Sequence, residues 1–97
     1  MKSVEFHPEA EAEFIAAAEY YEAHAKNLGL DFISALERAY RRLVEFPDTG
    51  HPFGGRLRRV LVPGFPYAVI YHATAERILI VAVAHLHRRP GYWRART

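Results

Sequence analysis

Hydrophobic positions in the first half of the chain recur with a helical period. Val4–Phe6 alternates and predicts a short opening strand, and Pro8 suits the first turn of a helix. The apolar stripe of that helix comprises Ala10, Phe14, Ala17, Tyr21 and Ala25. A second helix, from about Leu30 to Pro47, has a stripe of Phe32, Ala35, Leu36, Ala39, Leu43 and Phe46. The short link through Gly29 predicts an antiparallel helical hairpin.

The second half of the chain changes to the period of strands. Residues 47–56 are rich in proline and glycine and predict a loop. Three strands follow, over about Leu57–Val62, Pro66–His72 and Arg77–His85. Ile78–Ala84 is apolar throughout, which is typical of an interior strand. We therefore predict an α+β fold in which an N-terminal strand, the helical hairpin and a three-stranded antiparallel meander follow one another. The predicted sheet order is 1-4-3-2, with the hairpin on one face.

Length and composition restrict the class of protein. The 97 residues suffice for one domain, and we expect residues 1–97 to form a single one. The absence of cysteine excludes disulfides and thiolate zinc sites. The N-terminus soon turns acidic, unlike a signal peptide, and the longest apolar stretch is too short to span a bilayer. We expect a cytoplasmic protein that does not contact a membrane.

Charge is divided unevenly between the two halves. Residues 1–50 carry five cations against ten acids, a net −5, and residues 51–97 carry eight arginines against Glu76 alone, a net +7. This asymmetry predicts an acidic or polyanionic partner for the second half. Arginine suits that role because its planar guanidinium makes paired contacts with phosphate or carboxylate.

Candidate chemistry gathers after the last predicted strand. His85 and His87 should share a face, and Arg88, Arg89, Tyr92, Trp93 and Arg94 follow closely. A metal site would require a third ligand, which the neighbouring sequence does not offer, so no metal is expected. Acid–base chemistry on a phosphate is a second interpretation. The third is a flap in which the two aromatic rings cover an open end of the core.

Three more arginines lie at the start of the second predicted strand. Arg56 and Arg58 should share one face and Arg59 the other. They are either part of a cationic surface or charges that protect a sheet edge. No P-loop, dinucleotide fingerprint or nucleophile elbow is present, so we expect no cofactor.

Several motifs, taken in order, resemble one known family. They are Val4–Ala10, Tyr20-Tyr21, Phe46-Pro47, Arg59 ahead of Phe65–Tyr71, Val81–His85 and Arg88–Trp93. Together they are similar to the RelE/ParE superfamily of toxins from bacterial type II toxin–antitoxin modules, over Val4 to about Arg96. The resemblance implies a toxin neutralised by an acidic, ParD-like antitoxin in a hetero-oligomeric complex.

The resemblance leaves two targets open. RelE-like members cut messenger RNA on the ribosome, and the corresponding residues here would be Arg58, Arg59, His85 and Tyr92. ParE-like members inhibit DNA gyrase and are not known as enzymes, and the ending through Trp93 favours this branch. The resemblance then implies no catalytic residue, and the proposed target-binding residues are His85, His87, Arg88, Arg89, Tyr92, Trp93 and Arg94. The proposed antitoxin-binding residues are Arg56, Arg58 and Arg59. A third interpretation is a non-toxic module that binds nucleic acid.

Overall fold

The computed structural model describes residues 2–89 and 91–96, so Pro90 of the Arg88–Trp93 motif lies outside the described residues. The helical hairpin forms as predicted. Helix α1 (Pro8–His24) and helix α2 (Leu28–Glu45) are joined by a short link in which Asn27 adopts a left-handed φ of 70°. Asparagine tolerates this conformation better than most residues, so it can reverse the chain here.

The sheet has five strands where four were expected. Its order is β1-β5-β4-β3-β2, from β1 (Ser3–Phe6), β2 (His51–Pro52), β3 (Arg58–Leu61), β4 (Tyr67–Ala73) and β5 (Arg77–His85). The predicted order 1-4-3-2 is therefore wrong in detail, because β2 adds an edge strand inside the segment predicted as a loop. The order of the other four strands agrees with the prediction. Strand β1 pairs in parallel with β5, and the other pairs are antiparallel.

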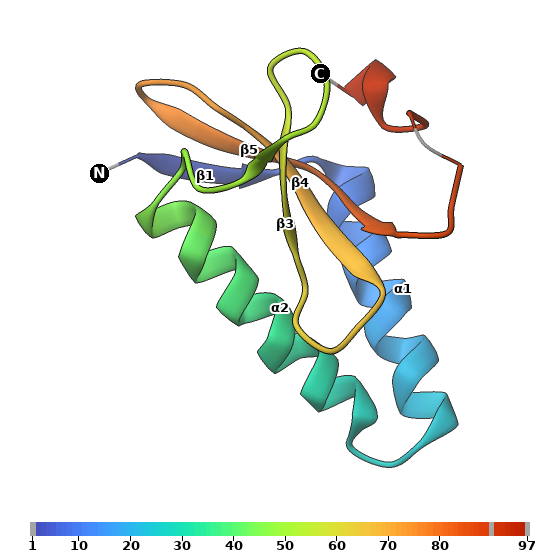
Figure 1. Ribbon diagram of the computed structural model, residues 1–97. Helices are drawn as coiled ribbons and strands as arrows, with labels where there is room; N and C mark the ends of the chain where they lie inside the picture. The colour runs from blue at the N-terminus through green and yellow to red at the C-terminus, as the bar shows by residue number, and fades with distance from the viewer. Residues whose placement is uncertain (1, 90, 97) are drawn as a thin grey trace.

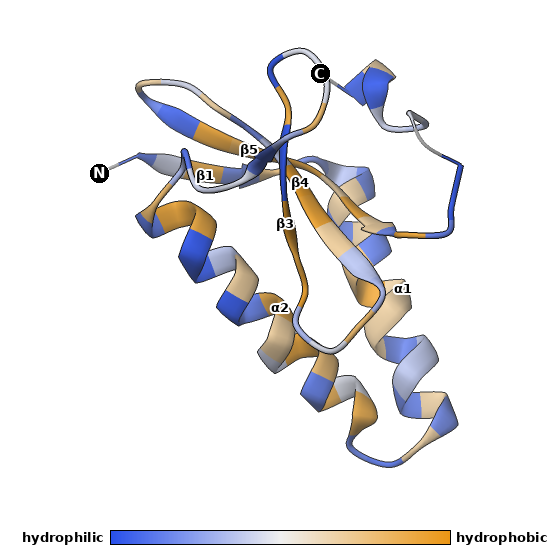
Figure 2. Cartoon of the chain, in the orientation of Figure 1, coloured by the Kyte–Doolittle hydropathy of each residue, from blue (hydrophilic) through white to orange (hydrophobic). Residues whose placement is uncertain are grey.

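Both helices cover one face of the sheet (Figure 1). Their buried residues, led by Phe32 and Leu43, form one core with Val69, Tyr71 and Ile80 of the sheet. Figure 2 shows the hydrophobic and hydrophilic positions alternating along α2, as the sequence predicted. Two members of the predicted stripes are exposed, however. Ala25 follows α1 and Phe46 follows α2, so neither lies on a helical face that could be buried.

The other face of the sheet has no helix. Its core consists of Leu57, Ile70, Val81, Ala82, Ala84 and Trp93. Strand β5 contributes to both cores because successive side chains of a strand point to opposite faces. Its register with β4 shifts between Ile70 and Tyr71: Ala82 is paired with Ile70, and Ile80 with Tyr71. Val81 is thus the extra residue of a β-bulge, and the bulge reverses which side chains point to which face. The uninterrupted apolar run is explained by this double burial.

Neither helix in the described ranges has the length and apolar character needed to cross a bilayer.

Candidate functional site

The segment after β5 returns to cover the helix-free face. Trp93 is 3% exposed and contacts the core of that face, with its ring 5.5 Å from the ring of Phe53. The flap interpretation is thus correct for Trp93. Its indole Nε1 has no hydrogen-bond acceptor among residues 2–89 and 91–96. After Trp93 the chain forms a short 3-10 helix, η1 (Arg94–Arg96).

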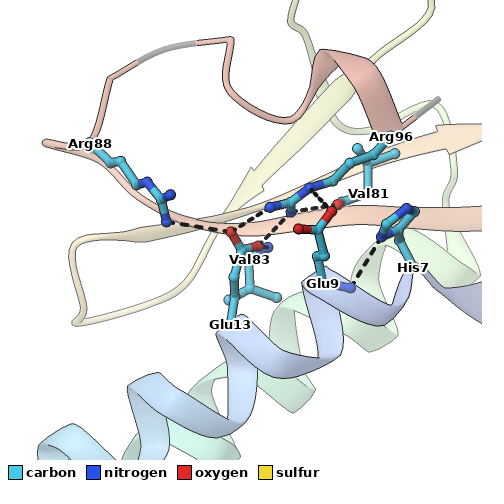
Figure 3. Close-up of polar contacts among 7 residues, drawn as sticks. All are labelled: His7, Glu9, Glu13, Val81, Val83, Arg88 and Arg96. Carbon is cyan, nitrogen blue, oxygen red and sulfur yellow. Dashed lines mark hydrogen bonds and ion pairs between the residues drawn. The ribbon is translucent and has the colours of Figure 1, made fainter.

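A largely buried ion pair, in which both side chains keep some exposure, joins this segment to α1. Arg96 donates from its two terminal nitrogens to the two carboxylate oxygens of Glu13, at 2.9 and 3.2 Å, and its Nε lies 3.4 Å from Glu9 (Figure 3). The side chains of Arg96 and Glu13 are only 9% and 14% exposed. Burial acts to lower the pKa of Arg96, but the neighbouring acidic groups, Glu13 first and then Glu9, together raise it above its ordinary value. Sequence reasoning missed this pair.

The same pair satisfies the open edge of β5. Glu13 accepts a hydrogen bond from the Val83 backbone N–H at 3.0 Å, and Arg96 donates to the Val81 carbonyl at 3.2 Å. Strand β1 pairs with β5 only as far as Ile80, so these backbone groups have no neighbouring strand on that side. The ion pair therefore takes the place of a strand beside the bulge.

Tyr92 lies close to two guanidinium groups. The Cζ of Arg88 is 3.9 Å and that of Arg96 is 5.1 Å from the centre of its ring, a geometry that favours cation–π attraction. Arg88 also lies 3.7 Å from Glu13 (Figure 3). Burial, and then the neighbouring Glu13 carboxylate, raises the pKa of Tyr92. Its hydroxyl is buried, so it does not face an incoming phosphate.

The two histidines lie where the strand ends. His85 is the last residue of β5 and His87 lies beyond it, so the strand that was expected to place both histidines on one face does not reach His87. Their rings are nevertheless 5.1 Å apart. The Nδ1 of His85 accepts a hydrogen bond from the His87 backbone N–H at 3.0 Å, which leaves the proton of the neutral ring on Nε2. Within the described ranges, no three metal-ligating side chains come together.

The three arginines at the start of the second predicted strand do not lie together on one surface. Arg58 faces the helix side and donates to the carbonyls of Gly50, at 2.8 Å, and Asp48, at 3.3 Å. Arg59 is on the opposite face, with its Cζ 4.6 Å from the ring centre of Phe53. Arg56 lies before β3, so the prediction that it shares a strand face with Arg58 is wrong.

Two hollows adjoin the end of β5. On the helix side, a hollow of about 240 Å³ is lined by residues that include Glu13, Tyr20, Tyr67 and Tyr92. On the helix-free side, a hollow of about 200 Å³ is lined by residues that include Phe53, Arg59, Ala84 and Trp93. His85 and Arg88 line both hollows. Residues predicted as target-binding and as antitoxin-binding therefore meet at one place.

The remaining predicted residues lie around this place. Arg89 is exposed in the irregular segment that follows β5. The guanidinium of Arg94 lies close to Gly54: a Cβ added at Gly54 would be 2.9 Å from it. Both residues line a third hollow of about 340 Å³, together with Arg56. The second-half arginines thus spread from the β3 side of the sheet to the end of β5.

Residues 4–90 match the family described as the ParE toxin of the type II toxin–antitoxin system parDE. The chain belongs to that family. A solved structure described as "Chromosomal ParDE TA system from P. aeruginosa" matches with a TM-score of 0.78 and 15% sequence identity. The match covers 90% of this chain and 98% of that one, and at this identity it shows a shared fold. No curated protein matches the sequence significantly.

The family assignment covers only part of the site in this ParE-family chain. Glu13, Arg59 and His85 lie within the matched residues 4–90, whereas Tyr92, Trp93 and Arg96 lie beyond them. The family match therefore does not extend to Trp93 or to the Arg96 end of the ion pair with Glu13.

Proposed function

We propose that this chain is a toxin that inhibits DNA gyrase and is neutralised by an acidic, ParD-like antitoxin. Membership of the ParE family supports a toxin of a type II module. The observation that supports gyrase as the target is the cationic surface around the end of β5, where His85 and Arg88 border two hollows. A surface of this kind suits binding to a large acidic partner.

The positions of the candidate catalytic residues favour binding over cleavage. Cutting RNA through its own 2′-hydroxyl requires a base, an acid and a cation around one phosphate. Arg58 is on the helix side and bonded to backbone carbonyls, and Arg59 is on the other face. The Tyr92 hydroxyl is buried, and its raised pKa makes it a poor proton donor near neutral pH.

A supercoiling assay tests the proposal directly. Purified protein should block ATP-dependent supercoiling by gyrase, and expression without antitoxin should arrest growth with a DNA-damage response. Arg89→Ala should raise the half-inhibitory concentration about tenfold, because an exposed arginine at the target surface is a frequent contributor to binding. Arg41→Ala on the outer face of α2, where the side chain is 77% exposed, is the matched control. Normal supercoiling at saturating protein would refute the gyrase target.

One observation keeps messenger RNA cleavage as a second candidate. Arg59 and His85 line the same hollow, so a cation and a titratable ring are available together. This alternative predicts cleavage of translated messages in a cell-free extract, abolished in His85→Ala and retained in Arg41→Ala. Intact messages would exclude it, and harmless expression of the chain alone would leave only the nucleic-acid-binding module.

A further inference from the structure

The hollow on the helix-free face has an apolar floor made of small side chains. Ala68 of β4 and Ala84 of β5 are opposite one another in the strand register and lie beside Ile70. Phe53 and Trp93 also line the hollow, and their rings contact each other, with centres 5.5 Å apart, so that together they form one aromatic wall. Alanine at two paired positions leaves space that larger residues would fill, so the hollow follows directly from the sequence of these strands.

The size of the hollow indicates its class of occupant. Its volume of about 200 Å³ is below the roughly 300–1,000 Å³ typical of small-molecule sites. It has room for one large apolar side chain supplied by another protein. Buried anchors of this kind dominate the energy of many protein interfaces.

The rim of the hollow indicates the charge of that protein. Arg59 stacks on Phe53 and has no salt bridge within the described residues, so its positive charge is not balanced by the chain itself. Arg88 stands at the same rim with its side chain 56% exposed. A carboxylate next to the anchor side chain would complement these guanidinium groups.

From these features we infer that the antitoxin inserts a large apolar side chain into this hollow, over the alanine floor and against Phe53 and Trp93, and places a neighbouring carboxylate on Arg59. This inference rests on the proposed function, which supplies the acidic antitoxin. It also gives neutralisation a mechanism: His85 and Arg88 border this hollow, so the inserted segment covers residues proposed to bind the target. The antitoxin then blocks the target surface directly.

The test uses the full-length product of the reading frame adjacent to this gene as the probe. Its affinity for the full-length chain is measured by calorimetry. Ala84→Leu fills the hollow and Arg59→Glu reverses the rim charge, and each should weaken binding about tenfold or more. Arg41→Glu makes the same charge change on the outer face of α2 and should stay within about twofold of wild type. Urea titrations confirm that each variant is folded; if Ala84→Leu does not fold, Arg59→Glu decides alone.

Three results would overturn the inference, and they differ in what they say of the proposed function. Folded Ala84→Leu and Arg59→Glu that bind as tightly as wild type would place the antitoxin elsewhere and leave the proposed function intact. Variants that lose toxicity but keep antitoxin affinity would assign the hollow to the target. Absence of any complex with the wild-type chain would refute the proposed antitoxin and, with it, this inference.

Discussion

Replacing Glu13 with alanine removes the central group of the partly buried ion pair. The variant loses two charge-assisted hydrogen bonds to Arg96, at 2.9 and 3.2 Å, and the acceptor of the Val83 N–H at 3.0 Å. Breaking a fully buried pair by removing one partner typically costs about 3–5 kcal/mol, which is an upper bound for this partly buried pair. Glu9 remains 3.4 Å from Arg96 and compensates in part, so we expect a loss of about 2–3 kcal/mol in the free energy of unfolding.

Urea unfolding followed by two signals measures this loss. Circular dichroism reports the helices, and fluorescence reports Trp93, the only tryptophan in the chain. Because Arg96 holds the segment that carries Trp93, the fluorescence transition of Glu13→Ala should move to lower urea than the helical one. A double-mutant cycle with Arg96→Ala should give a coupling of about 1–2 kcal/mol.

An exposed ion pair provides the control. Arg77 and Glu5 lie 3.2 Å apart, but their side chains are 49% and 55% exposed. Glu5→Ala should cost less than about 1 kcal/mol, since exposed pairs contribute little. If Glu13→Ala costs no more than Glu5→Ala, or if the cycle shows no coupling, the ion pair does not hold the segment and the reasoning is refuted.

Three further substitutions test other contacts. Tyr71→Phe removes a buried hydroxyl that donates to the Pro47 carbonyl at 2.6 Å, so urea titration should show a loss of about 1–3 kcal/mol. Gly29→Ala places a Cβ 2.6 Å from the Ala18 carbonyl oxygen, where the helices approach closely, and should lower the Tm; an unchanged Tm would contradict this contact. The pKa of Tyr92 is raised by folding, so its contribution to stability is complete below about pH 10 and is lost as the pH rises further. Above about pH 10, urea titrations should show that the free energy of unfolding falls with pH less steeply in Tyr92→Phe than in the wild type. The difference in slope should be up to about 1.4 kcal/mol per pH unit.

The periodic parts of the fold were predictable from the sequence. Both helices have apolar positions at regular spacing, and Pro8 and Pro47 mark helix boundaries. Strands β3, β4 and β5 are apolar segments separated by turn residues. Strand β2 was not predictable, because two residues carry no period and Pro52 argues against a strand except at an edge. The bulge was hidden because an apolar run that is buried on both faces looks the same with or without a register shift.

The candidate site was predictable in its residue types but not in its assembly. The sequence separates Glu13 from Arg96 by 83 positions, and each alone is typical of a solvated surface charge. One signal was available: Glu13 lies between Ala10 and Ala17 at helical spacing, so a carboxylate interrupts the apolar stripe of α1. A charge in such a position requires a partner, and the excess of arginine in the second half supplies it.

The ion pair and the helix-free hollow are connected through the segment that carries Trp93. Arg96 fixes this segment to α1, and Trp93, three residues earlier, forms a wall of the hollow. If the wall is held in place before the antitoxin arrives, binding does not bear the entropic cost of ordering it. Glu13→Ala should therefore weaken antitoxin binding severalfold although Glu13 does not line that hollow, whereas Glu5→Ala should leave the affinity unchanged. Calorimetry on the two variants decides the matter: equal affinities would mean that the hollow keeps its shape without the ion pair.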